Sequence, residues 1–385
     1  MTPVVITGMG AVSSLGDSAT ELWEGLLRAT RKPAPAPEDC GMAERPPVYR
    51  VESPAQEPSK QAGRTLGRAG AMACHAVGEA LRDAGLDKER PPGTGLTVGT
   101  SLGDIDLAES GLAAGEGAGR GIFRVASAVA GRYGLGGPNN TLSTACSSGA
   151  YAVSAAAELI DGGQADVVVA CGTDGYSRVA LASLERFGLL DHTVCRPFDA
   201  DRRGMVTGDG AAALVLESAE HARRRDAVPY AVVESYAWSC DAHHQTAPEP
   251  TGAQLGRAVR EALDGSSGPP GAVLLHRAGI AVNDDVESAT VATALGDRVD
   301  RTPALAIKGV IGHTAGAAGV FACVAAAQIV HHRVVPPNSH VSTLDPHCPL
   351  QVPVIGPTPL TEPRVLVSAT GFGGNNVALV VGAAR

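Results

Sequence analysis

Residues 141–150 read Thr-Leu-Ser-Thr-Ala-Cys-Ser-Ser-Gly-Ala, and this stretch decides the fold. Its first residues are typical of the end of a β-strand, and the small residues after Cys146 begin an Ala-rich helix. Cys146 then lies at the N-terminus of a helix, where free N–H groups and the helix dipole favour a thiolate. A lone cysteine is more often a small buried apolar residue. We therefore expect Cys146 to be an activated nucleophile only if other reactive groups accompany it.

Outward from this turn, short β-branched runs alternate with Ala-rich helical stretches along the whole chain. The predicted strands are Pro3–Gly8, Gly95–Gly99, Ala165–Cys171, Ala211–Leu216, Tyr230–Ser235, Ala272–Leu275, Val365–Ser368 and Val377–Gly382. The predicted helices are Glu21–Ala29, Arg64–Ala84, Ser148–Asp161, Gly252–Leu263, Val286–Leu295 and Ala315–Val330. Strands separated by helices of this length favour parallel sheets covered by helices on both faces.

A charged, helix-like segment over Ala219–Asp226 separates two such α/β blocks. The alternation hints at a duplication, although βαβ units resemble one another in any case. We divide the chain into an N-terminal half, residues 1–224, which carries Cys146, and a C-terminal half, residues 225–385. We expect the two halves to pack as one body.

Composition excludes several classes of protein. The formal net charge of the 385 residues is −9, and no basic run extends beyond Arg223–Arg225, which argues against nucleic-acid binding. The first residues carry no cationic leader, and the most apolar run, Ala315–Val330, is short for a membrane span. The 8 cysteines contain no Cys-x-x-Cys pair, and His243–His244 and His331–His332 are adjacent rather than one helical turn apart. We expect a cytoplasmic protein with free thiols, no metal site and no membrane association.

Two histidines and a glycine turn accompany Cys146 in the second half. His276 comes directly after the predicted strand Ala272–Leu275, and His313 lies in a glycine-rich turn before the helix predicted from Ala315. Residues 368–376 read Ser-Ala-Thr-Gly-Phe-Gly-Gly-Asn-Asn, a turn able to aim backbone N–H groups at an oxyanion. One cysteine with two histidines in separate turns suits nucleophilic acyl chemistry.

These motifs resemble those of the β-ketoacyl-acyl-carrier-protein synthases. The resemblance is carried by Thr-Ala-Cys-Ser-Ser-Gly at 144–149, by Lys-x-x-x-Gly-His-x-x-Gly-Ala-Ala-Gly at 308–319 and by Gly-Phe-Gly-Gly-x-Asn at 371–376. It continues through Arg-Pro-Phe-Asp-Ala-Asp-Arg at 196–202 and Asp-Ala-His-His at 241–244. It implies the thiolase fold, in which two similar α/β halves stack in five αβαβα layers and the protein dimerises.

The resemblance also implies roles for the site residues. Cys146 would accept an acyl group from the thioester of a carrier protein. His276 and His313 would stabilise the enolate formed when malonyl-carrier protein loses carbon dioxide. Phe372 and Gly373 would contribute to the oxyanion site and gate the pocket.

Three further residues have supporting roles by the same resemblance. Lys308 is expected to pair with Glu287, and Asp284 stands at its expected distance after His276. No free cofactor is implied, because the substrates travel on the phosphopantetheine of an acyl carrier protein. The expected partners are that carrier protein and a second subunit, either a copy of this chain or another ketosynthase-like protein.

The first histidine motif departs from the family pattern. The family reads His-Gly-Thr-Gly-Thr where this chain reads His276-Arg277-Ala278-Gly279-Ile280. Ala278 and Ile280 lack the hydroxyls that hold the phosphopantetheine arm, and each lost hydrogen bond costs roughly 0.5–1.5 kcal/mol. Arg277 is expected to add bulk and positive charge beside the arm channel, or else to be solvated.

Three functions remain open at this point. The first is a ketosynthase of a type II polyketide-like or fatty-acid-like pathway. The second is an acyltransferase or hydrolase that uses Cys146 without elongating the chain. The third is a non-elongating partner subunit like the chain length factors, which generally lack the nucleophilic cysteine. A thiolase is disfavoured because no cysteine follows Cys348 to act as its base.

Overall fold

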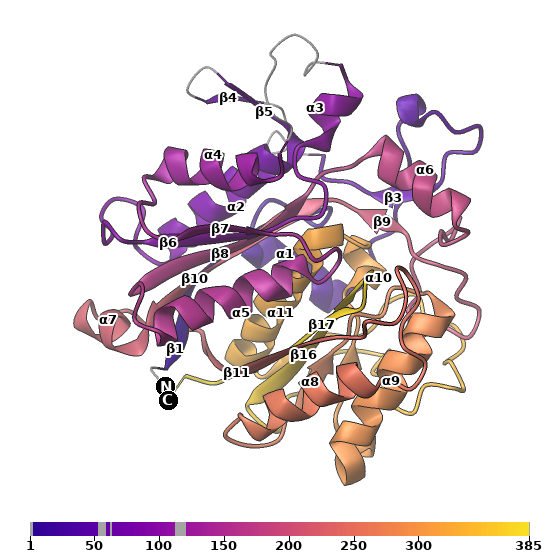
Figure 1. The fold of residues 1–385 in the computed structure, drawn as a ribbon. Coiled ribbons are helices and arrows are strands. Elements are labelled where there is room, and N and C mark those ends of the chain that lie inside the picture. Colours follow the sequence, from indigo (N-terminus) through magenta and orange to yellow (C-terminus); the bar gives the residue numbers. More distant parts are fainter. Residues whose placement is uncertain (1–2, 53–58, 62–63, 112–120, 385) are drawn as a thin grey trace.

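The computed structural model describes residues 3–52, 59–61, 64–111 and 121–384. Five layers follow one another, helices alternating with halves of a large sheet (Figure 1). The sheet has 10 strands in the order β13-β12-β16-β17-β11-β1-β10-β8-β6-β7. Its halves meet only where Val4–Ile6 of β1 pair antiparallel with residues 231–233 of β11.

The two halves of the sheet have the same topology. The first half-sheet comprises β1 (Val4–Val12), β6 (Gly95–Gly99), β7 (Asn139–Leu142), β8 (Val167–Asp174) and β10 (Gly210–Ser218). The second comprises β11 (Ala231–Cys240), β12 (Ala272–Leu274), β13 (Ala304–Leu305), β16 (Arg364–Gly371) and β17 (Asn375–Gly382). In each half the spatial order is the third, second, fourth, fifth and first strand of that half along the chain. The duplication and the five layers expected from the resemblance are confirmed, whereas the boundary between residues 224 and 225 stays a prediction.

The expectation of purely parallel sheets is wrong. Within the large sheet, only β7, β6 and β8, and likewise β13, β12 and β16, run parallel to one another. The other pairings in the large sheet are antiparallel. For β16 and β17 the reason is local: three residues, 372–374, join them, and a parallel crossover needs a dozen or more.

Helices fill the three remaining layers (Figure 1). One outer layer is α2 (Arg68–Asp83) and α4 (Phe123–Tyr133), and the other is α8 (Ala253–Asp264) and α9 (Ala281–Leu295). The middle layer holds α5 (Ser148–Asp161) and α11 (Ala318–His332). The remaining helices are α1 (Ala19–Arg28), α3 (Ile105–Glu109), α6 (Arg178–Arg186), α7 (Ala219–Arg224) and α10 (Lys308–Ile311). Short strands β2 (Ala34–Pro35), β3 (Pro47–Tyr49), β4 (Ser59–Gln61), β5 (Arg64–Leu66), β9 (Thr207–Gly208), β14 (Val334–Val335) and β15 (Thr358–Pro359) form small separate sheets.

The apolar segment predicted over Ala315–Val330 is a core helix. It forms a short 3-10 turn and then α11, which is apolar on all sides and packs between the two half-sheets. Within the described ranges, Ala315–His332 is the one helical stretch long and apolar enough to cross a bilayer, and 78% of it is buried inside the molecule. Its burial accounts for its apolar composition without a membrane.

Glycines let α5 and α11 approach until their backbones touch. A Cβ atom on Gly319 of α11 would lie 2.2 Å from the backbone nitrogen of Ala150, and one on Gly149 would lie 2.7 Å from the carbonyl oxygen of Gly316. This contact brings the start of α5, which Cys146 precedes, against the turn that follows His313. The middle layer therefore joins chemistry from both halves of the chain.

Most predicted elements lie where the sequence places them. Gly95–Gly99 and Ser148–Asp161 match β6 and α5 in full. Among the larger elements, α4 and α6 were not predicted, and only the end of β7 was. The short elements α3, α10, β13 and the strands of the small sheets were not predicted either. Edge strand β7 reads Asn-Asn-Thr-Leu, which lacks the β-branched run that marks buried strands.

Replacing Gly319 by Ala forces α5 and α11 apart, because the added methyl would overlap backbone atoms of Ala150. We expect the free energy of unfolding to fall by about 1–3 kcal/mol, measured by urea denaturation. Gly93→Ala is the matched control, since no atom lies within 4 Å of a Cβ at that exposed position. Equal stability of the two variants would contradict the close helix contact.

Candidate active site

Cys146 stands on a sharp turn between β7 and α5. Ala145, directly before it, has φ of 51°, a left-handed conformation that costs a non-glycine residue roughly 1–2 kcal/mol. The turn is held by the Ala145 carbonyl oxygen, which accepts hydrogen bonds from the Ser101 and Ser148 hydroxyls at 2.9 and 2.5 Å. Ser148 Oγ also accepts the N–H of Thr144 at 2.9 Å. These contacts fix the direction in which the thiol points.

His276 and His313 meet Cys146 from the second half of the chain. The two imidazoles lie edge to face, with ring centroids 5.3 Å apart and planes at 84°. The Cys146 sulfur and one nitrogen of each ring lie within 4.8 Å of one another. The three residues singled out in separate turns thus form one cluster.

Burial sets the protonation of this cluster. It lowers the pKa of His276 and of His313 well below the usual range, and the nearby Lys308 charge lowers both further. Burial also lowers the pKa of Lys308, which Glu287 opposes. At neutral pH both imidazoles are therefore neutral, and each offers one N–H donor and one acceptor nitrogen.

The expectation of a thiolate at Cys146 is wrong for the resting site. Although solvent reaches part of the residue, protein surrounds the sulfur, and burial raises the pKa of the thiol to about 11. Lys308 and the backbone N–H groups of Phe372 and Cys146 oppose this only in part. Cys146 is thus a thiol at neutral pH.

Two carboxylates of α9 hold the segment that carries His276. Glu287 accepts the N–H groups of His276 and Arg277 at 2.7 and 2.8 Å. Asp284 accepts those of Ala278 and Gly279, both at 3.0 Å. The loop is therefore fixed through its backbone, by the two carboxylates that the sequence singled out as supporting residues.

Lys308 does not form the expected ion pair with Glu287 within the part of the chain that the structure describes. Its ammonium instead donates to the carbonyl oxygen of His276 and lies 3.5 Å from Nδ1 of the same residue. The two oxygens of Glu287 instead accept the backbone N–H groups of His276 and Arg277. Lys308 is thus placed to orient His276.

The Phe372–Gly374 turn between β16 and β17 contributes Phe372 but not Gly373. The Phe372 N–H lies against the Cys146 sulfur, and Phe372 lines the cavity beside it. Gly373 has φ of 85°, and its N–H donates to the carbonyl oxygen of Gln245 at 2.8 Å. The expected oxyanion role of Gly373 is therefore wrong, and the N–H groups of Phe372 and Cys146 remain as donors.

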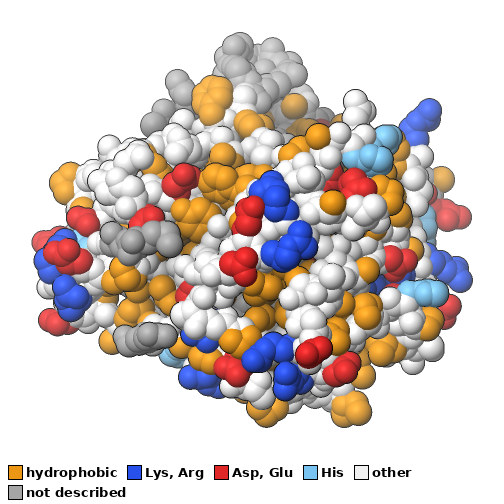
Figure 2. Space-filling model, turned by 60° about the horizontal axis from the view of Figure 1, so that its bottom comes forward, with side chains coloured by type: hydrophobic (Ala, Val, Ile, Leu, Met, Phe, Trp, Pro, Cys, Tyr) orange, Lys and Arg blue, Asp and Glu red, His pale blue; other side chains and the backbone are white. Residues whose placement is uncertain are grey.

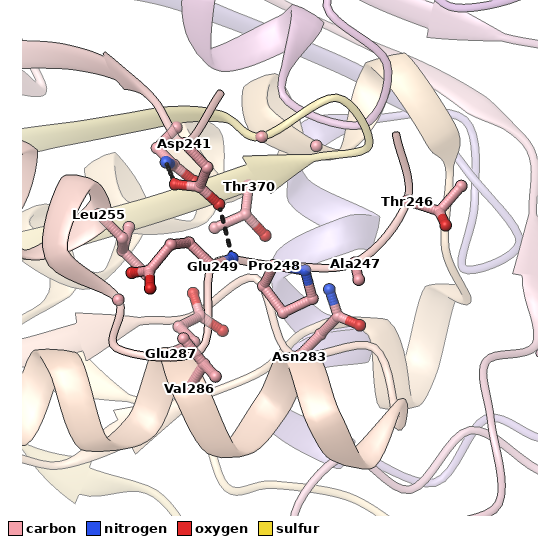
Figure 3. Close-up of a pocket in the computed structure, with 14 residues that line it drawn as sticks. Asp241, Thr246, Ala247, Pro248, Glu249, Leu255, Asn283, Val286, Glu287 and Thr370 are labelled. Carbon is pink, nitrogen blue, oxygen red and sulfur yellow. Dashed lines mark hydrogen bonds between the residues drawn. The ribbon is translucent and has the colours of Figure 1, made fainter. Parts of the chain in front are cut away.

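The cavity beside Cys146 is small, about 20 Å³. Besides Cys146, His276 and His313, it is lined by Met205, Ala278, Ile280, Asn283, Thr370, Gly371 and Phe372. A second cavity of about 30 Å³ lies next to it, between α9, β16 and residues 246–249 (Figure 3). Ala278 and Ile280 thus face the reacting centre, as the altered motif suggests.

Arg277 neither lies beside the channel nor is solvated, so both expectations for this residue are wrong. Its side chain is 0% exposed and 4.5 Å from the ring centroid of Phe198. The guanidinium donates to the Pro197 carbonyl at 2.9 Å, to the hydroxyl of Ser288, and to Asp345 at 3.1 Å. Arg277 is therefore a buried structural residue whose charge acidic side chains balance.

One positioning residue was missed in the sequence. Asp174, at the end of β8, is buried and each of its carboxylate oxygens accepts two hydrogen bonds. Oδ1 accepts from Thr100 Oγ1 and Leu102 N at 2.7 and 2.8 Å, and Oδ2 accepts from Ser101 N and Gly316 N at 2.9 and 2.6 Å. The sequence could have indicated Asp174, because it is an acidic residue at the end of a buried apolar strand. The predicted strand ended at Cys171 and therefore did not include it.

Comparison with known proteins identifies the family. A model of the β-ketoacyl synthase N-terminal domain matches residues 1–222, and one of the C-terminal domain matches residues 230–342. The chain belongs to the β-ketoacyl synthase family.

Relatives match the chain over nearly its whole length. The tetracenomycin polyketide synthase ketoacyl synthase alpha subunit of Streptomyces glaucescens is 32% identical, over 98% of this chain and 96% of the relative. 3-Oxoacyl-[acyl-carrier-protein] synthase 2 of Staphylococcus aureus is 29% identical, over 98% and 97%. The solved structure of the ishigamide ketosynthase/chain length factor has a TM-score of 0.89 and 31% identity, with complete coverage of both chains.

The charge of Lys308 disfavours a metal ion between Cys146, His276 and His313. Cys146, His276 and His313 offer donor atoms that could approach a metal ion. The ammonium of Lys308, 3.5 Å from Nδ1 of His276, repels a cation there. On the face drawn in Figure 2, Lys and Arg side chains are mixed with Asp and Glu rather than gathered into a basic surface.

The raised pKa of Cys146 predicts its alkylation profile. The rate with iodoacetamide should rise about tenfold per pH unit between pH 7 and 10, because only the thiolate reacts. Lys308→Met should slow the reaction throughout this range, because the cation that favours the thiolate is gone. Peptide mass spectrometry at Cys146 gives the rates, and a plateau below pH 9 would contradict the assignment.

Asp174→Asn should destabilise the protein. The substitution replaces one carboxylate oxygen by an NH₂ group, which cannot accept the two hydrogen bonds that this oxygen accepts in the wild type. Each donor left without a partner costs about 1–3 kcal/mol of folding free energy. We expect a loss of about 2–6 kcal/mol in urea denaturation. Asp300→Asn, at an exposed position, is the control. A loss no larger than that of the control would show that Asp174 does not hold the site together.

Proposed function

We propose that this chain catalyses decarboxylative Claisen condensation between an acyl group on Cys146 and malonyl-carrier protein. The observation that carries the proposal is the cluster of one thiol and two neutral imidazoles within 4.8 Å, enclosed at the junction of the two halves. The pathway is of the type II polyketide or fatty-acid kind, and we place it in the cytoplasm.

In the first step Cys146 takes the acyl group from an incoming thioester. The thiol proton passes to a neutral imidazole, the sulfur bonds to the acyl carbon, and the phosphopantetheine thiolate leaves and is protonated. The N–H groups of Cys146 and Phe372 stabilise the oxyanion of the tetrahedral intermediate. Acyl transfer thus needs a neutral histidine as acceptor, because the thiol is protonated at rest.

In the second step the C–C bond to the malonyl carboxylate breaks and carbon dioxide leaves. The electron pair moves onto the thioester as an enolate, whose oxygen is stabilised by N–H donors of His276 and His313. Since the Lys308 ammonium faces Nδ1 of His276, the ring proton is assigned to Nε2. The enolate carbon then bonds to the acyl carbon, and the Cys146 thiolate leaves and takes up a proton from solvent, because its own proton left with the phosphopantetheine thiol in the first step.

The names of the relatives support the choice of substrates and partners. The Staphylococcus aureus relative is named for an acyl carrier protein, and the Streptomyces glaucescens relative is an alpha subunit of a polyketide synthase. We therefore propose an acyl carrier protein as donor, with no free cofactor. The ishigamide structure pairs a ketosynthase with a chain length factor, which supports a homodimer or such a heterodimer.

A second function has one observation in its favour. Ala278 and Ile280 leave the wall beside Cys146 without the expected hydroxyls, which would weaken malonyl-carrier protein binding more than simple acyl transfer. A Cys146-dependent acyltransferase or hydrolase would need only the first step. A non-elongating subunit is disfavoured because Cys146, His276 and His313 are all present.

Two variants separate these functions. Cys146→Ala should abolish the acyl adduct seen by intact-protein mass spectrometry after incubation with acyl-carrier proteins. His276→Ala should retain the adduct but lose release of carbon dioxide from malonyl-carrier protein, by about a hundredfold or more. Unchanged release would refute the role of His276, and an adduct in Cys146→Ala would refute the nucleophile.

A further inference from the structure

Two polar side chains without hydrogen-bond partners face the cavity beside Cys146. Asn283, near the start of α9, and Thr370, on β16, line it together with the catalytic cluster. Within the described residues, neither side chain makes a hydrogen bond. The remaining side chains of this wall are apolar, which leaves these two as its polar groups outside the catalytic cluster.

Asn283 and Thr370 stand where the two cavities meet. Both residues, with Gly371, also line the 30 Å³ cavity below residues 246–249. In Figure 3 they come from different elements, α9 and the strand end, and lie on either side of Pro248. A group that reaches from the cavity beside Cys146 into the second cavity therefore lies against residues that line both.

Two backbone N–H groups beside Ala278 are already engaged. The N–H groups of Ala278 and Gly279 are both bound by the Asp284 carboxylate. Ile280 is the N-cap residue of α9, and its side chain makes no cap hydrogen bond. Among the side chains of this wall outside Cys146, His276 and His313, the amide of Asn283 and the hydroxyl of Thr370 are the polar partners for a ligand.

We propose that Asn283 and Thr370 bind the amide groups of the phosphopantetheine arm, in place of the hydroxyls that positions 278 and 280 lack. The arm carries two secondary amides, each with one N–H and one carbonyl. The Asn carboxamide and the Thr hydroxyl each both donate and accept, so either can satisfy an arm amide. This inference rests on the proposed function, in which substrates reach Cys146 on that arm.

The test compares two acyl donors that carry the same acyl group. Acyl-pantetheine has both amides, and the p-nitrophenyl ester has none. We expect Asn283→Ala and Thr370→Val each to slow acylation of Cys146 by acyl-pantetheine about fivefold to tenfold. Acylation by the p-nitrophenyl ester should stay within twofold of wild type, with rates read by intact-protein mass spectrometry.

Thr293→Val is the matched control, because Thr293 lies on the exposed side of α9 and bonds only to the Ala289 carbonyl of its own helix. It should change neither rate, and the melting temperature of each variant reports on folding. Equal slowing with both donors, or no slowing with either, would overturn the inference. Wild type acylated by the ester but not by acyl-pantetheine would overturn it as well, and wild type acylated by neither donor would refute the proposed function itself.

Discussion

The buried carboxylate of Asp174 is the interaction on which the arrangement of this active site depends. It binds the backbone after β6 and the turn after His313 at the same time, through Ser101 and Gly316. Ser101 in turn holds the carbonyl of Ala145, which precedes Cys146. A carboxylate in such surroundings is costly unless every lone pair is matched, and here each oxygen accepts two hydrogen bonds. The nucleophile of one half and a histidine of the other are thereby fixed to a common anchor.

Burial of the site also determines the protonation states of Cys146, His276 and His313. Removing water from the cluster keeps His276 and His313 neutral and Cys146 protonated. Neutral imidazoles can accept the thiol proton in one step, which charged imidazolium groups could not do, and can donate to an enolate in the next. Lys308 supplies the positive charge from behind His276, where it orients the ring without blocking the reacting face. Burial therefore gives the site its reactivity through proton transfer rather than through a preformed thiolate.

Cys146, His276 and His313 could be predicted as site residues from the sequence, because each lies in a recognisable turn of small residues. Sequence reasoning also placed β6 and α5 in full, since their patterns are local. It failed where the outcome depends on distant partners. Packing between segments far apart in the chain sets the direction of the strands and the burial that raises the pKa of Cys146. It also buries the Arg277 side chain and places the Gln245 carbonyl where it accepts the Gly373 N–H. Asp174 escaped notice for the same reason, because its four donors come from two separate turns.

The most direct test of this account follows the acyl group after it has reached Cys146. Enzyme carrying an isotopically labelled acyl group on Cys146 is mixed with malonyl-carrier protein, and both proteins are analysed by mass spectrometry over time. The account predicts that the label leaves the enzyme and appears on the carrier protein as a β-ketoacyl group, with one carbon dioxide released per label transferred. A label that stays on Cys146, or that passes to water or a small nucleophile while malonyl-carrier protein remains intact, would contradict the central claim.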